Sequence, residues 1–315
     1  SLETPGLNCL SEDWLASQET LDEKLRFYLA NELIRKLSLT WFGGSITAKW
    51  WNDLWIHEGL STFLSYHILA NSEDFKYKYP NSWFYFFFEK ERAYYQDQLS
   101  IIHAVAHDVY STHQAENIQD GIIREKAAAA LKQLITAIGI DTFQDALKQL
   151  IKEYHSKNIE LRDFMKCLQD SLNNRGIEAD ISRWEAQWLK SPGLNEIEVF
   201  ADIEEGQLTG INIVQTVATR NLVALRDHRC KLAFFYDNAE ESIHSVEITD
   251  ETITSIELPR MTKPVGILLN YDDEDYVKLR FDRVSFNYFK RSLHVNSEIK
   301  ILIHLRLSKI SRQRG

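Results

Sequence analysis

Histidines beside acidic residues are the side chains of this chain that could do metal chemistry. His57 directly precedes Glu58, His67 follows ten positions after His57, and His103 and His107 are four positions apart. A zinc site on a helix commonly uses the motif HExxH, in which two His project from one face and the Glu activates a zinc-bound water. The segment that begins at His57 lacks the second His of this motif, and the later pair stands alone in a loop-rich stretch. Each of these histidines is therefore more typical of an ordinary half-buried or surface residue than of a zinc ligand.

The segments that would position these residues are predicted to be helices. A capping box at residues 20–23 precedes leucines at positions 25, 29, 33 and 37, which is the spacing of one helix face. Asp141 and Asp180 are predicted to be N-caps of later helices. Further helices are predicted over residues 54–70, 82–99, 124–137, 141–154, 160–174 and 178–189. The first 190 residues are thus predicted to be mainly helical.

A different pattern begins after the breaker cluster Ser191-Pro192-Gly193. Apolar and polar residues then alternate with a period of two, which is typical of half-buried strands. Strands are predicted over residues 196–200, 210–214, 230–236, 244–248 and 265–270. Short strands at regular spacing predict a small β-sandwich. The pattern turns helical again from about residue 283, so the predicted fold class is α+β.

The composition is that of a globular chain that does not bind nucleic acid. The 315 residues suffice for about two domains, 44% of them are apolar, and the formal net charge is −10. Nucleic acid binding needs clustered Lys and Arg, and no apolar run is long enough for a membrane span. The three cysteines, Cys9, Cys167 and Cys230, form no CxxC pair and are predicted to be reduced and buried. Such usage suits an intracellular location, in the cytoplasm or the interior of an organelle.

Two tryptophan-rich segments carry a resemblance to a known family. Residues 41–43 read Trp-Phe-Gly, and residues 50–55 read Trp-Trp-Asn-Asp-Leu-Trp. With the segments that follow them, they resemble the aminopeptidase N family of zinc metallopeptidases (gluzincins), in particular its bacterial-type alanyl aminopeptidase branch. The resemblance continues in the family's order through residues 93–99, 120–122, 130–134, 188–195, 225–229 and 268–273. It therefore covers nearly the whole chain.

The resemblance implies a zinc site whose positions have changed in this chain. In the family, HExxH on one helix and a Glu on the next hold the zinc, and a Trp follows the second His by two positions. Placing Trp41 on that tryptophan puts the first His on Arg35, the general base on Lys36 and the second His on Leu39. The third ligand, nineteen positions beyond the second His, then falls on Glu58, which is indeed a Glu. A rival register puts the motif on residues 31–35, which keeps its Glu as Glu32 but needs a four-residue insertion; neither register keeps a histidine.

Two further active-site positions of the family have changed as well. A GAMEN motif holds the free amino group of the substrate, and residues 1–7 lie at that place, with Glu3 matching the motif's Glu. A tyrosine of the family stabilises the oxyanion, and its position is occupied by Arg124. The resemblance thus implies that Glu3 could still recognise an N-terminal amine while the oxyanion donor is lost.

These replacements predict that the whole zinc mechanism is absent. A catalytic zinc needs three protein ligands, Arg is not a practical ligand because it stays protonated, and Lys36 carries the wrong charge to accept a proton. We expect Arg35 or Lys36 to form an ion pair with Glu58 in the place of zinc, because an unpaired buried charge costs several kcal/mol. The alternative is a solvated Glu58 on a widened cleft.

The favoured interpretation is a catalytically inactive aminopeptidase-like protein that serves as a structural or interaction subunit of a larger assembly. It would use no cofactor and bind protein partners. Two alternatives stay open: a zinc aminopeptidase that removes N-terminal residues from peptides, and a non-cleaving peptide-binding module.

The resemblance also implies a domain layout. Residues 1–192 would form a mostly helical, thermolysin-like former catalytic domain that is N-terminally incomplete. Residues 193–282 would form the β-sandwich, and residues 283–315 the start of a C-terminal helical domain. The chain is accordingly expected to be a piece of a longer protein.

Overall fold

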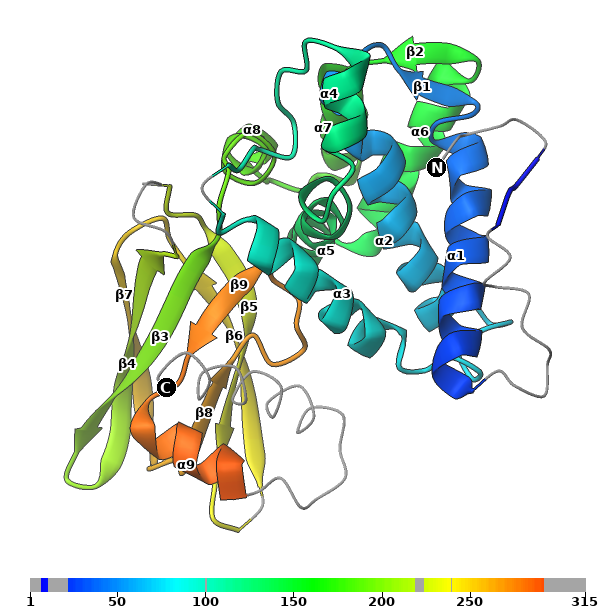
Figure 1. Cartoon of the computed structure of the whole chain (residues 1–315). Helices are drawn as coiled ribbons and strands as arrows, with labels where there is room; N and C mark the ends of the chain where they lie inside the picture. The colour runs from blue at the N-terminus through cyan, green and yellow to red at the C-terminus, as the bar shows by residue number, and fades with distance from the viewer. Residues whose placement is uncertain (1–6, 11–21, 100, 219–223, 239, 292–315) are drawn as a thin grey trace. The chain divides into compact units, whose positions relative to one another are not determined.

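The computed structural model describes residues 7–10, 22–99, 101–218, 224–238 and 240–291. The chain forms two compact units (Figure 1). Unit 1 comprises Ser1–Gln96 and His103–Lys190, and unit 2 comprises Asp97–Ile102 and Ser191–Gly315. Unit 1 is mainly helical and unit 2 is built mainly of strands, so the predicted α+β class is confirmed at this level.

Helices dominate unit 1, together with one small parallel sheet. That sheet pairs β1 (Ile46–Ala48) with β2 (Lys157–Ile159). The α-helices are α1 (Glu23–Trp41), α2 (Trp55–Asn71), α3 (Ser82–Gln96), α4 (Thr112–Asn117), α5 (Ala127–Ile138), α6 (Ile140–Tyr154), α7 (Leu161–Arg175) and α8 (Ile181–Trp184). Three shorter turns of other pitch join them: the 3₁₀ turn η2 (Trp51–Asp53) and the π-helical turns η3 (Ile122–Lys126) and η4 (Glu185–Leu189).

The helix starts test the predicted caps. Helix α1 begins at Glu23, and its N-cap is Asp22, whose side chain accepts a hydrogen bond from the Leu25 N–H at 2.7 Å. The predicted capping box would place the N-cap at residue 20 and was therefore two residues too early. Asp180 caps α8 as predicted, through the Arg183 N–H at 2.9 Å. The prediction for Asp141 was wrong, because α6 begins one residue earlier, at Ile140. The Asp141 carboxylate instead lies in the first turn, near the positive end of the helix dipole.

Helix α2 is the centre of unit 1 and is buried on nearly every side. Trp55, Leu60 and Phe63 are at most 2% exposed. Gly59 lies where η3 and the start of α5 approach closely: a Cβ at this position would lie 2.4 Å from the Ala127 Cβ and 2.9 Å from the Ile123 carbonyl oxygen. Only a glycine permits this approach, which brings η3 against α2.

In the residues that the structure describes, unit 2 contains two sheets and a short helix. Its elements are β3 (Asn195–Glu204), β4 (Gln207–Val217), β5 (His228–Phe235), β6 (Glu241–Ile248), β7 (Ile253–Thr262), β8 (Gly266–Leu269), β9 (Val277–Arg280) and α9 (Arg283–Arg291). The strand order is β7-β4-β3-β9 in one sheet and β6-β5-β8 in the other. Strands β3 and β9 pair in parallel, with Asn195 opposite Val277, and the remaining pairs are antiparallel.

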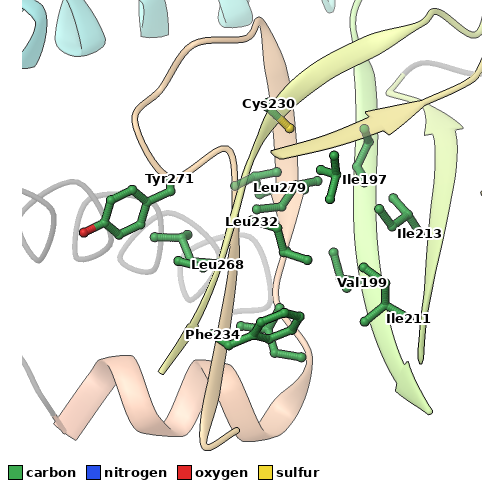
Figure 2. Close-up of a cluster of buried hydrophobic side chains, with 14 of the residues drawn as sticks. Ile197, Val199, Ile211, Ile213, Cys230, Leu232, Phe234, Leu268, Tyr271 and Leu279 are labelled. Carbon is green, nitrogen blue, oxygen red and sulfur yellow. The ribbon is translucent and has the colours of Figure 1, made fainter. Parts of the chain in front are cut away.

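A single apolar cluster receives side chains from both sheets (Figure 2). Alternate residues of β3, Ile197 and Val199, face this cluster, as the period of two requires. Leu232 and Phe234 of β5 and Leu268 of β8 come from the other sheet and are at most 1% exposed. Burial of these residues accounts for the alternation that predicted the strands.

A buried polar network lies beside this core. Arg226 is 2% exposed and donates hydrogen bonds to Asn195 Oδ1 at 2.9 Å and to the carbonyl oxygens of Ser191 and Pro192 at 3.0 and 2.9 Å. Burial lowers the pKa of its guanidinium below the ordinary value. Asp97 accepts a hydrogen bond from the Gly193 N–H at 2.9 Å. The breaker cluster is thus held by both an arginine and a carboxylate.

The cysteines differ from one another. Cys167 and Cys230 are buried, whereas Cys9 is exposed, so the prediction that all three are buried was wrong for Cys9. All three are free thiols. In the ranges that the structure describes, no helix combines the length and apolar character needed to cross a membrane.

Candidate functional site

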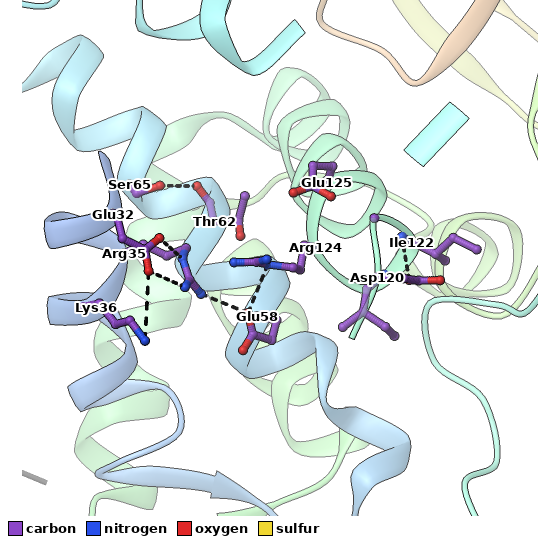
Figure 3. A network of polar contacts seen from close by, with 12 residues as sticks. Glu32, Arg35, Lys36, Glu58, Thr62, Ser65, Asp120, Ile122, Arg124 and Glu125 are labelled. Carbon is purple, nitrogen blue, oxygen red and sulfur yellow. Dashed lines mark hydrogen bonds and ion pairs between the residues drawn. The ribbon is translucent and has the colours of Figure 1, made fainter. Parts of the chain in front are cut away.

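The side chains of Arg35 on α1 and Glu58 on α2 meet in the interior of unit 1 (Figure 3). The Arg35 Nη1 atom donates to Glu58 Oε2 at 3.0 Å. Arg35 is 5% exposed and Glu58 2% exposed. The predicted ion pair is therefore present for Arg35, and the alternative of a solvated Glu58 is wrong.

Glu32, one turn earlier on α1, fixes the other edge of this guanidinium. Arg35 Nε and Nη2 donate to the two oxygens of Glu32 at 2.9 and 2.8 Å, a bidentate contact. Burial alone would lower the pKa of Arg35, but its hydrogen bond to Glu32 and the charges of Glu58 and Glu32 outweigh burial and raise that pKa. Burial likewise raises the pKa of Glu32, and the hydrogen bond and charge of Arg35 outweigh it, so the net pKa is lowered. Both groups are thus held in their charged forms.

Lys36 does not pair with Glu58. Its Nζ lies 4.0 Å from Glu32 Oε1, at the i, i+4 spacing, and the residue is 9% exposed. The prediction offered Arg35 or Lys36 as the partner of Glu58, and the structure selects Arg35.

A second arginine reaches the same carboxylate. Arg124 Nε lies 3.2 Å from Glu58 Oε2, and the Arg124 side chain is 26% exposed. Arg124 is part of the π-helical turn η3, whose first N–H groups are capped by Asp120: its Oδ1 accepts from Ile122 at 2.8 Å and from Ile123 at 3.2 Å. Such π-helical turns are rare and frequently mark functional sites. Together with the close approach at Gly59, this turn places Arg124 over Glu58.

The next residue of the turn, Glu125, faces a different partner. Burial raises the pKa of its carboxyl group, against the charge and hydrogen bonds of Arg92. Arg92 Nη2 donates to both carboxylate oxygens at 3.0 and 2.8 Å. Glu125 is therefore matched by one cation and adds no net charge to the neighbouring cluster.

The remaining predicted positions lie as follows. Leu39 is 3% exposed and belongs to the apolar core, and Glu3 lies outside the described residues. His57 is buried, its Nε2 accepts a hydrogen bond from the Ala48 N–H at 2.8 Å, and burial lowers its pKa to about 4. His67 stacks on Phe63 at a ring separation of 5.4 Å. His57 and His67 thus have the contacts of residues that stabilise the fold.

The i, i+4 pair of histidines forms a small cluster away from Glu58. The rings of His103 and His107 lie 4.3 Å apart, and each Nδ1 lies 2.9 Å from the Ala104 carbonyl oxygen. Burial lowers the pKa of His103, but the hydrogen bond to Asp120 at 3.2 Å outweighs burial and raises it. Burial and the neighbouring His103 lower the pKa of His107. The two rings thus connect the loop at Ala104, and His103 also connects it to Asp120.

The side chains around Glu58 do not fit a zinc ion. A protein-bound catalytic zinc takes three ligand side chains, whereas one oxygen of Glu58 is shared by two arginines. Arginine has no lone pair to offer a metal because it stays protonated. Across the described ranges, no group of three or more His, Cys, Asp or Glu side chains could hold a metal ion.

Comparison with known proteins decides the family. The model of the Peptidase family M1 domain matches residues 1–188. The chain belongs to peptidase family M1. The predicted resemblance to the aminopeptidase N family is thereby confirmed. This family M1 chain is 29% identical to the aminopeptidase N of Streptomyces lividans over 300 residues, which are 90% of this chain and 34% of that protein.

Two further relatives have similar names. The leucyl aminopeptidase of Saccharolobus solfataricus is 22% identical over 289 residues, which are 91% of this chain and 33% of that protein. Aminopeptidase M1-A of Oryza sativa subsp. japonica is 27% identical over 188 residues, 59% of this chain and 20% of that protein. The family M1 chain thus spans about a third of the length of the first two relatives.

Sequence reasoning did not predict the contacts of two members of the cluster around Glu58, namely Glu32 and Arg124. Glu32 precedes Arg35 by three positions and Lys36 by four, which is the spacing of ion pairs on a helix and could have revealed it. Arg124 was predicted to occupy the position of the family's tyrosine, but not to contact Glu58. That contact depends on the π-helical turn and on the approach at Gly59, neither of which a sequence pattern indicates.

Proposed function

We propose that this family M1 chain is a catalytically inactive aminopeptidase relative that serves as a structural or interaction subunit of a larger assembly. One observation carries the proposal: Glu58, placed by the family's motif at the third zinc ligand, has Arg35 at 3.0 Å and Arg124 at 3.2 Å. Two guanidinium groups beside this carboxylate repel a divalent cation. A metal ion would also find Glu58 as its one ligand side chain among these residues, where a catalytic zinc needs three.

The proposed register assigns Arg35, Lys36 and Leu39 to the first His, the general base and the second His. The contacts of α1 support this register over its rival, which would place the first His at Asn31. The Asn31 side chain donates to Ser65 Oγ at 3.0 Å, two helical turns along α2 from Glu58. Arg35 reaches Glu58 but is a ligand position in both registers, so the contact of Asn31 with Ser65 rather than Glu58 is what favours the proposed one.

The proposal includes the layout and setting expected from the family. A thermolysin-like former catalytic domain over residues 1–192 would be followed by a β-sandwich over 193–282 and the start of a helical domain over 283–315. Protein partners would cover part of its surface, in the cytoplasm or the interior of an organelle. The relatives' names, all aminopeptidases, make peptides the class of molecule that such a fold would meet.

Metal content and hydrolysis test the proposal directly. The chain is incubated with zinc, dialysed, and analysed for bound metal, and the same sample is assayed with a simple aminoacyl substrate. The aminopeptidase N of Streptomyces lividans serves as the positive control for both measurements. We expect no retained zinc and no turnover. Stoichiometric zinc with turnover would show that the chain is an enzyme with an unusual site.

A further inference from the structure

The charges around Glu58 do not cancel. We define the Glu58 cluster as Glu32, Arg35, Lys36, Glu58 and Arg124, which meet through the contacts described above. Three of these side chains are cations and two are carboxylates, so the cluster carries one net positive charge. The charge of the nearby Glu125 also acts on Arg35 and Arg124, but Glu125 is ion-paired with Arg92, and this pair adds no net charge.

Arg124 keeps hydrogen-bond donors that the Glu58 cluster does not use. It meets Glu58 as an ion pair through Nε, which is buried and forms no hydrogen bond; within the ranges described, neither of its Nη atoms has a hydrogen-bond partner either. The Arg124 side chain is 26% exposed, so part of it is open to solvent. Lys36 adds to the field, since over the same ranges its nearest acidic partner is Glu32 at 4.0 Å, beyond hydrogen-bond distance.

A guanidinium with two open Nη groups is suited to one kind of ligand. Its planar fork matches a carboxylate with two parallel hydrogen bonds, and such charge-assisted bonds are about twice as strong as neutral ones. In a partly desolvated site the attraction also exceeds its value in water. A bound carboxylate would neutralise the net charge of the Glu58 cluster.

We propose that Arg124, within the Glu58 cluster, binds a carboxylate group of a peptide. The inference rests on the proposed function, since a zinc ion at Glu58 would exclude the two arginines. It reverses the polarity that the family's chemistry implies: the site that would hold a cation and the amino end of a peptide here selects an anion. The carboxylate belongs either to the C-terminus of a peptide or to an Asp or Glu side chain.

Peptide binding to the intact chain tests this proposal. The probes are N-acetylated tripeptides of alanine with a free C-terminus or a C-terminal amide, and N-acetylated, amidated peptides with a central Glu or Gln. Binding is followed by isothermal titration calorimetry. We expect at least about tenfold weaker binding when the carboxylate of the preferred source is replaced by an amide. The first pair of peptides reports the C-terminus and the second pair reports a side chain.

Two variants locate the site. Arg124→Gln is expected to weaken binding of the carboxylate peptide at least about tenfold, to the level of its amide. Arg162→Gln is the matched control, because it removes an arginine of unit 1 whose side chain is 77% exposed and pairs with Glu160. It should leave binding unchanged. The comparison of acid with amide on the unaltered chain needs no variant, so it decides even where Arg124→Gln does not fold.

Several results would overturn the inference. Equal binding of acid and amide peptides, no binding of any probe, or binding that Arg124→Gln leaves intact would each do so. The metal and hydrolysis assays on the same sample keep the two proposals apart. Retained zinc with turnover contradicts the proposed function, whereas a zinc-free, inert chain that ignores carboxylates contradicts the carboxylate site alone.

Discussion

Each unit of the molecule buries an arginine, and the two arginines are satisfied in opposite ways. Arg35 of unit 1 contacts two carboxylates, and its pKa is raised despite burial. Arg226 of unit 2 donates to an amide oxygen and two backbone carbonyls, and burial lowers its pKa. The acceptors of Arg226 hold the backbone at Ser191 and Pro192, and the charges of Asp97 and Asp275 offset only part of its burial, whereas two carboxylates contact Arg35 directly. The difference separates an arginine that joins backbone segments from one that belongs to a buried ion-pair cluster.

The largest expected effect comes from changing the ligands around Glu58. The double substitution Arg35→His with Leu39→His removes one guanidinium and places two imidazoles at i and i+4 beside Glu58. We expect the variant to retain about one zinc ion per chain after dialysis, measured by elemental analysis.

The control for this experiment is the rival register. Asn31→His with Arg35→His puts the same two imidazoles four positions earlier and should bind no zinc. Zinc in this control, and none in the first variant, would show that the register drawn through Trp41 is wrong.

The next effect tests the structural arginine. Arg226→Met leaves three buried acceptors without their donor, which should lower the free energy of unfolding by about 4 kcal/mol, as for other broken buried polar networks. Urea denaturation measures the loss. Arg226→Lys keeps the charge but cannot span three acceptors, so most of the loss should remain. A change below about 1 kcal/mol for Arg226→Met would contradict the structural role.

A double-mutant cycle addresses the pair in unit 1. Glu58→Leu leaves Arg35 buried with one carboxylate fewer and should cost about 3 kcal/mol of unfolding free energy. Adding Arg35→Met should return stability to within about 1 kcal/mol of the original chain, because well-packed apolar residues replace a buried ion pair without net cost. Additive losses in the cycle would mean that Arg35 and Glu58 are not coupled.

Acid should weaken unit 1 through the neighbour of Glu58. The pKa of His57 is about 4 in the folded chain against 6.5 for a free histidine, so its contribution is fully present above pH 6.5 and is lost as the pH falls toward 4. Between pH 6.5 and 4.5 we expect a loss of about 2 kcal/mol from this group. Urea denaturation at both pH values measures it. His57→Gln should flatten this part of the pH dependence, and an unchanged slope would contradict the assignment.

Much of the helical part of the fold follows from sequence patterns. The helix predicted over residues 54–70 is α2, Trp55–Asn71, because its apolar residues are too many for any arrangement but a buried helix. Strand β7 was missed because it lies at a sheet edge and contains Pro259, which interrupts the alternation. Strand β9 was missed because four residues are too few for a periodic signal. The π-helical turns escaped prediction since their winding is set by tertiary packing.

The site was predictable where a motif fixed positions and not where packing did. Arg35 and Glu58 follow from the spacing behind Trp41, and their opposite charges require a pair once both are buried. The second contact, from Arg124, needs the close approach that Gly59 permits. A glycine in a helix pattern indicates some close neighbour but does not say which residue arrives.

The excursion of Asp97–Ile102 into unit 2 means that the backbone passes between the two units three times. A fragment cut at residue 190 would therefore separate Asp97 from Gly193, whose N–H it accepts at 2.9 Å. After one nick near residue 190, only the Asp97–Ile102 segment of unit 2 stays covalently attached to unit 1. Limited proteolysis at this site would therefore give a piece that holds all of unit 1 and a second piece that lacks one segment of unit 2.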